Sequence, residues 1–260
     1  MTPSPSLSGP TIAPTATFFA QQPTDIPFDE FYEGQNDPTA AALAPGAALP
    51  PLEVGSTPGT PAASAGVRVV EVTALDGGLL RGQLYQGGDV RQPGVLLLAG
   101  AGDEWSGFAA QLYDTGFTVL VMPLREPAPL LDFPILLQAL SSGEADPASL
   151  GVIGAGRGAD VALLGCAGDL LCDTVVLLSP TGDPALPNAM PAFNPRPLLL
   201  AASEDDATAF AAAQSIQAAA TGEVIVQPFT SAGSGTAMLA NRPDLAGLII
   251  QWLQRHIGAP

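Results

Sequence analysis

From residue 67 to the end of the chain, short apolar runs alternate with amphipathic stretches. The runs have the length of strands, and the stretches between them space their apolar residues three or four positions apart, as helices do. The predicted strands cover residues 95–99, 117–122, 150–153, 174–178, 197–202 and 223–227. The predicted helices cover residues 104–115, 130–140, 207–220, 243–256 and the segment after Gly156. Strands this apolar need cover on both faces, so the alternation predicts an α/β fold with a mostly parallel, doubly wound sheet.

Two segments of this region depart from the alternation. Residues 67–75 and 79–85 flank Asp76-Gly77-Gly78 and predict an antiparallel hairpin. Between residues 178 and 197 the chain is rich in proline, and we expect a connecting segment there.

The N-terminal quarter of the chain has a different composition. Residues 1–66 hold twelve of the 27 prolines and no basic residue, which predicts an irregular arm preceding a single domain at residues 67–260. Five of the thirteen Phe and Tyr side chains gather in this arm: Phe18, Phe19, Phe28, Phe31 and Tyr32. The arm is either a linker with scattered aromatics or a peptide whose rings anchor it to the domain or to a partner. We expect the arm to mediate binding to a protein partner or self-association.

The charge balance excludes several functions. Eight arginines against 25 acidic residues give a formal charge of −17, which repels nucleic acid and anionic lipid. The absence of lysine excludes Schiff-base chemistry and a phosphate-binding P-loop. The sequence has no run of 18 apolar residues, so it predicts no transmembrane segment. We expect no cofactor and no metal ion, and a secreted or cell-surface location, with the cytoplasm as the alternative.

Cysteine and histidine are scarce. Cys166 and Cys172 lie six residues apart, a spacing compatible with a disulfide or with two buried thiols, but not with a metal-ligand set. His256, the only histidine, falls in the last turn of the closing helix, where the helix dipole favours an imidazolium.

The chemistry-bearing motif lies at residues 154–158. The sequence Gly154-Ala155-Gly156-Arg157-Gly158 follows a predicted strand and opens a helix, as G-x-S-x-G does in a nucleophile elbow, with Gly156 at the position of the serine. Residues 154–159 also satisfy G-x-G-x-x-G/A, the pattern of a dinucleotide site, but the next predicted strand ends without the acidic residue that such a site uses.

Around this motif, residues 67–260 resemble the α/β-hydrolase superfamily, in particular dienelactone hydrolases and esterases. Residues 96–102 resemble the segment after the third strand, so the resemblance implies an oxyanion hole at the backbone of Ala101 and Arg157. Residues 201–206 resemble the turn that carries the triad acid, with Asp206 the better match and Asp205 one register away. Residues 231–236 resemble the loop of the triad histidine, with Ser234 at the position of the base.

Further residues fall at the same predicted edge of the sheet and define a possible pocket: Gly100, Asp103, Glu104, Arg125, Asp183 and Asp205. These charges form either a solvated loop surface or a pocket in which Arg157 pairs with Asp206.

Because Gly156 and Ser234 replace a nucleophile and a base, the sequence predicts a catalytically inactive protein that serves as a binding or structural subunit outside the cytoplasm. The alternative is an active or residual serine-esterase-type hydrolase. A third hypothesis is a nucleotide binder that uses residues 154–159.

Overall fold

The computed structural model describes residues 66–87, 90–100, 105–126 and 129–258. The five aromatic residues predicted to anchor the arm lie outside the described residues, so the division into an arm and a domain stays a prediction.

The described residues build one eight-stranded sheet with the order β1-β2-β4-β3-β5-β6-β7-β8. The strands are β1 Val67–Thr73, β2 Leu79–Tyr85, β3 Gln92–Ala99, β4 Thr118–Pro123, β5 Ala145–Ala155, β6 Thr174–Leu178, β7 Leu198–Ser203 and β8 Val224–Phe229. β2 pairs antiparallel with β1 and with β4, and every pairing from β4 to β8 is parallel. The prediction of a mostly parallel α/β sheet with an N-terminal hairpin is confirmed.

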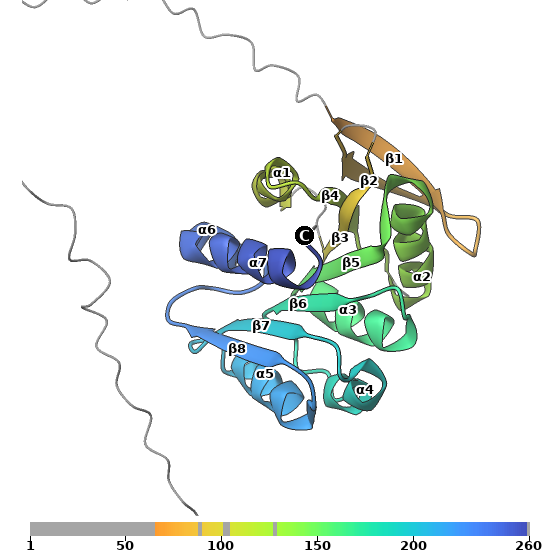
Figure 1. The fold of residues 1–260 in the computed structure, drawn as a ribbon. Coiled ribbons are helices and arrows are strands. Elements are labelled where there is room, and N and C mark those ends of the chain that lie inside the picture. Colours follow the sequence, from red (N-terminus) through yellow and green to blue (C-terminus); the bar gives the residue numbers. More distant parts are fainter. Residues whose placement is uncertain (1–65, 88–89, 101–104, 127–128, 259–260) are drawn as a thin grey trace, which may run out of the picture. The chain divides into compact units, whose positions relative to one another are not determined.

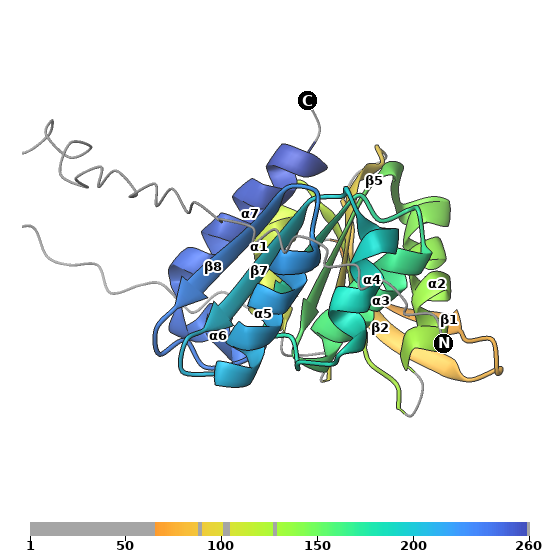
Figure 2. The same cartoon turned by 90° about the horizontal axis from the view of Figure 1, so that it is seen from below.

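Helices cover both faces of the sheet (Figures 1 and 2). They are α1 Ser106–Asp114, α2 Pro129–Ala139 with a π-helical turn η3 Leu140–Glu144, α3 Arg157–Gly168, α4 Ala185–Phe193, α5 Ala207–Ala219, α6 Ala237–Asn241 and α7 Pro243–His256. The first face carries α2 to α5, and the second carries α1, α6 and α7. No helix among the described residues is long and apolar enough to span a membrane.

Alternation along the central strands produces two hydrophobic cores. In β3, Leu96 and Leu98 belong to the core under α2 to α5, while Val95 and Leu97 belong to the core under α1 and α7. All four side chains are fully buried. Successive residues of a strand point to opposite faces, so a continuous apolar run supplies both cores at once.

Helix α4 occupies the proline-rich segment for which the sequence predicted only a connection. Pro187 lies in its first turn, where a missing backbone N–H removes no helical hydrogen bond. Leu186, Met190 and Phe193 lie on one face and are fully buried against the first core. The burial of this face stabilises the helix although Pro191 stands inside it.

The end of the sheet opposite Gly156, here called the cross-linked base, holds the amino ends of the parallel strands. Cys166 and Cys172 form a disulfide between the end of α3 and the start of β6. The guanidinium of Arg196, just before β7, donates to the carbonyl oxygens of both cysteines and of Asp169. In the same region, the Trp252 indole donates to the Thr174 hydroxyl over 2.8 Å.

Candidate functional site

The turn at Gly156 joins β5 to α3 at the carboxyl edge of the sheet. Gly156 has φ 57° and ψ −123°, and its N–H donates to the Leu178 carbonyl of β6 over 2.8 Å. One residue therefore reverses the chain from a buried strand into a helix, which is the backbone form of a nucleophile elbow.

The three glycines of this turn meet different surroundings. A Cβ on Gly154 would overlap the Gly158 carbonyl, and a Cβ on Gly158 would overlap the Leu98 carbonyl of β3. A Cβ on Gly156 would have no heavy atom within 4 Å. Close packing of backbone on backbone therefore requires the outer two glycines, whereas the central position faces open space.

The loop after β8 lies beside this turn. A Cβ on Gly235 would lie 3.8 Å from the backbone nitrogen of Gly156. The start of the loop is fixed because the backbone N–H of Ser231 donates to Asp205 Oδ2 over 2.6 Å and that of Ala232 donates to Ser203 Oγ over 3.2 Å. Ser234 is exposed on this loop.

The two carboxylates after β7 have different partners. Asp206 caps α5, since its Oδ1 accepts from the Ala209 N–H over 3.1 Å. Asp205, the neighbour one register away, is the carboxylate that reaches the loop after β8. The physical reason is that Asp206 lies at the N-cap of α5, where a side-chain oxygen satisfies a free helical N–H.

Two serines at this edge hold left-handed backbone conformations. Ser179, at the end of β6, and Ser231, after β8, both have φ 51°. This region is unfavourable for residues with a side chain, and such strain gathers at functional sites. The buried Ser179 hydroxyl lies 3.1 Å from the sulfur of Met238 in α6, which ties the edge to the short helix after the loop.

The predicted ion pair between Arg157 and Asp206 is wrong. Arg157 Nε lies 3.0 Å from Glu126 Oε1, and the two side chains are 59% and 55% exposed. Arg157 takes the solvent side because it is the first residue of α3, beside the loop that carries Glu126 and away from Asp206 at the start of α5.

The other predicted pocket residues separate into three groups. Arg125 donates to Asp132 through Nε and Nη2 and to Asp76 through Nη1, so it fixes α2 to the hairpin turn instead of facing a pocket. Gly100 is exposed at the end of β3. Asp103 and Glu104 lie outside the described residues, as does Ala101 of the predicted oxyanion hole.

His256 lies at the opposite edge of the sheet from the elbow. Its Nε2 is 3.7 Å from Glu223 Oε2, next to the first residue of β8, and its ring contacts Trp252. Burial lowers the pKa of His256, against the expectation of an imidazolium favoured by the helix dipole.

A cavity of about 530 Å³, here called the α2–α3 cavity, opens beside the elbow. Its aliphatic walls include Leu130 and Leu131 of α2 and Val161 and Leu164 of α3. Its polar end holds Arg157, Asp160, Thr181 and Asp183. The residue that follows Gly156 therefore contributes to both the elbow and the cavity.

Asp160 is the buried charge of this cavity. It is 6% exposed, and its carboxylate accepts from the Thr181 N–H over 3.0 Å and from the Thr181 hydroxyl. Burial raises the pKa of Asp160, although the bonds from Thr181 partly oppose this. The sequence reasoning missed both residues; a lone carboxylate one helical turn after Gly156, within the apolar run 159–163, was the available signal.

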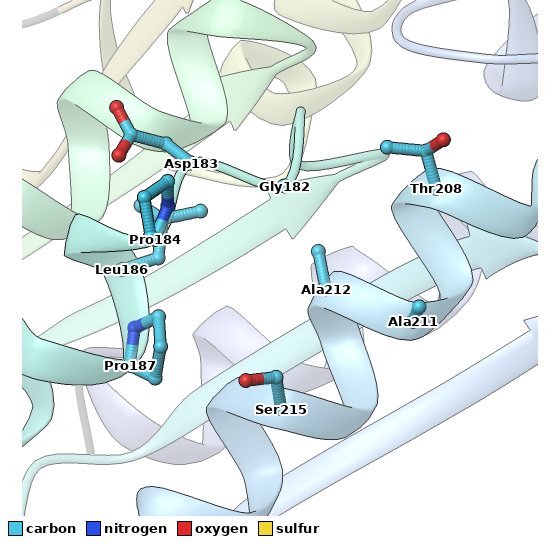
Figure 3. A pocket seen from close by; sticks show the side chains of 9 residues that line it. All are labelled: Gly182, Asp183, Pro184, Leu186, Pro187, Thr208, Ala211, Ala212 and Ser215. Atoms are coloured by element: carbon cyan, nitrogen blue, oxygen red, sulfur yellow. The ribbon is translucent and has the colours of Figure 1, made fainter.

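A second cavity, of about 290 Å³, lies between α4 and α5 (Figure 3). Pro187 of α4 and Ala212 of α5 line its facing walls, and Gly182 and Asp183 form one end. The Asp183 carboxylate is turned away from α5 in this view. This cavity has no residue of the elbow in its lining.

The described residues contain no group of three or more His, Cys, Asp or Glu side chains that could hold a metal ion.

No protein-family model and no curated protein matches this sequence. Solved structures do match. The esterase domain of a Rhodothermus marinus protein is 16% identical, with a TM-score of 0.63 over 74% of this chain and 100% of that chain. The α/β hydrolase GrgF from Penicillium sp. is 13% identical, with a TM-score of 0.63 over 74% and 99%. The thermophilic carboxylesterase EstE1 from a metagenomic library is 16% identical, with a TM-score of 0.60 over 75% and 90%.

These likenesses, together with the sheet order, show the α/β-hydrolase fold that the sequence resemblance implied. They contradict the prediction of a catalytically inactive binding or structural subunit. That prediction is wrong because it inferred inactivity from the substitutions at two positions alone. The similar structures named above are esterases and a hydrolase, and they favour the alternative of a hydrolase.

Proposed function

We propose that this chain is a carboxylic ester hydrolase of low turnover in which water attacks the ester carbonyl directly. The observation that carries the proposal is the elbow, which keeps its backbone form while its central position faces open space. Gly156 supplies no side chain there and Ser234 supplies no imidazole, so the reaction proceeds without a covalent acyl-enzyme and without a histidine base.

The helix α3 supplies the stabilising charge. The N–H groups in the first turn of a helix have no acceptor within that helix, and the helix dipole places positive potential at the same end. The turn at Gly156 directs this end of α3 toward the open space, where the carbonyl oxygen becomes negative as water adds to the carbon. The alkoxy group then leaves with a proton from the attacking water, and the products are a carboxylic acid and an alcohol.

The expected rate follows from the parts that remain. Enzymes stripped of their triad retain on the order of 10³ to 10⁴ over the uncatalysed reaction, from the oxyanion hole and binding alone. We expect this chain to work in that range.

The test is hydrolysis of p-nitrophenyl butyrate by the purified full chain, before and after treatment with a fluorophosphonate. We expect turnover above buffer that the reagent does not diminish, because water is the nucleophile. A contaminating serine esterase would be inhibited. Turnover equal to buffer, or turnover that disappears with the reagent, overturns the proposal.

Two variants at the elbow give opposite results if the proposal holds. Gly156→Asn fills the open space and should abolish turnover. Gly156→Ser combined with Ser234→His should raise turnover by about 10² or more and make it sensitive to the fluorophosphonate. Gly156→Ser alone should not raise turnover and Ser234→His alone should do little, because nucleophile and base act as a unit.

A further inference from the structure

The walls of the α2–α3 cavity are suited to an aliphatic chain. Its volume of about 530 Å³ falls within the roughly 300 to 1,000 Å³ typical of small-molecule sites. Leu130 and Leu131, adjacent at the start of α2, are 43% and 65% exposed. Two neighbouring leucines open to solvent at a concave site are unlike the scattered apolar residues of an ordinary surface, and a bound hydrocarbon would bury them.

The polar end of the cavity carries an excess of negative charge. Asp160 and Asp183 contribute two carboxylates, and Arg157 is the one basic side chain in the described lining. The charge of Arg157 is already paired with Glu126 at 3.0 Å. With Glu126 counted, three carboxylates stand against one arginine, so an anionic ligand would meet a net negative charge, whereas a cation would be attracted to it.

The pKa of Asp160 is consistent with this balance. Burial raises it most, the hydrogen bonds from Thr181 lower it, the negative charge of Asp183 raises it, and the positive charge of Arg157 lowers it. Asp183 accepts from the Ala185 N–H over 2.8 Å through Oδ1, and Figure 3 shows its carboxylate directed away from the neighbouring helix α5.

We infer that the α2–α3 cavity binds the substrate through an aliphatic chain that carries a positively charged amine. This inference rests on the proposed ester hydrolysis and names the class of ester: one with an alkylammonium group in its acyl or alcohol part. Arg157, which directly follows Gly156, lines the cavity, so the end of the chain at Arg157 is the end nearest the elbow.

Calorimetric titration of the full chain with three uncleavable probes tests the inference: hexyltrimethylammonium, 1-hexanol and hexanoate. We expect the cation to bind at least about tenfold more tightly than the anion, with the alcohol between them. This preference should shrink with added salt, because the rim carboxylates are partly solvated. Equal binding of cation and anion, tighter binding of hexanoate, or no binding of any probe overturns the inference.

Matched variants locate the binding. Leu131→Ser should weaken all three probes by about fivefold, because it removes apolar wall. The same change at Leu170, which is 90% exposed and outside the cavity lining, should leave binding unchanged.

A second pair of variants tests the charge. Asp183→Asn should reduce the preference for the cation, whereas Asp169→Asn should not. The two aspartates are matched because each accepts a hydrogen bond from the backbone N–H two residues further along the chain. Equal effects of a variant and its control would place the probes elsewhere.

Binding and turnover separate this inference from the function on which it rests. If the probes bind with the expected preference but esters are not hydrolysed, the proposed function fails and the cation site stands as a binding site. If esters are hydrolysed but hexanoate binds as tightly as the cation, the hydrolase stands and the substrate class is wrong.

Discussion

The two ends of the parallel strands are built in opposite ways. At the amino ends, side chains cross-link the elements: a disulfide, the forked hydrogen bonds of Arg196 and the Trp252–Thr174 bond connect α3, β6, β7 and α7. At the carboxyl ends, the elbow faces open space, the α2–α3 cavity lies beside it, and two serines hold strained backbones.

The difference indicates that one end of the parallel strands stabilises the fold and the other end holds the candidate site. A ligand site has unfilled volume and unpaired polar groups before the ligand binds, and this lowers the stability of the folded state. The cross-linked base offsets that cost at the other end of the same strands. Changes at the base should therefore reduce stability and spare the site, whereas changes at the open edge should spare stability unless they touch its packed floor.

The largest expected effect on stability is at Gly158, which packs against the backbone of β3 beneath the elbow. Gly158→Ala forces a methyl group into the Leu98 carbonyl and should lower the free energy of unfolding by more than about 4 kcal/mol. Gly156→Ala, two residues away, meets no heavy atom and should cost only about 1 to 3 kcal/mol, for an alanine at φ 57° and ψ −123°. Urea denaturation compares the two variants, and similar losses would contradict the difference between packed and open positions.

The second effect concerns Arg196 at the base. Arg196→Met leaves several inward-facing carbonyls without their donor, and we expect a loss of about 3 kcal/mol in the free energy of unfolding. Arg81→Met removes an arginine of an exposed ion pair with Glu71 and should cost well under about 1 kcal/mol. A loss for Arg196→Met no greater than for its control would show that the base does not depend on this clamp.

The third effect is that of the disulfide. Replacing both cysteines by alanine removes a cross-link that closes a short loop, for which about 2 kcal/mol is expected, with probe binding in the α2–α3 cavity unchanged. Denatured, unreduced protein should contain no titratable thiol. Two free thiols would contradict this and would also weaken our proposal that the chain resides in an oxidising, secreted or cell-surface compartment.

The smallest effect concerns Asp160 at the open edge. Because burial raises the pKa of Asp160, the folded state holds its proton more tightly than the unfolded state, and stability is lost as the pH rises above the ordinary aspartate value. Asp160→Asn removes this titration and keeps partners for Thr181. The melting temperature of the wild type should therefore fall relative to the variant between about pH 4 and neutrality. Parallel melting curves across this range would refute the assignment.

Much of the framework was predictable because it depends on local periodicity. The closing helix was predicted at residues 243–256 and lies at Pro243–His256, and the strand at residues 174–178 matches β6. The elbow was recognisable because glycines at fixed spacing between a strand and a helix describe a backbone turn, and Gly154 and Gly158 are required there by contacts close in sequence or across one strand pairing.

The partners of individual side chains depended on the tertiary structure. Arg157 pairs with Glu126 instead of Asp206, Asp205 reaches the loop after β8 in place of its neighbour, and α4 forms across prolines because a core lies beneath it. The α2–α3 cavity joins segments up to 54 residues apart, from Pro129 to Asp183. The sequence by itself determined the sheet, its helices and the turn at Gly156, because periodicity and steric exclusion act over a few residues. Which charges meet, and where volume is left open, was decided only when loops distant in the chain met at one edge.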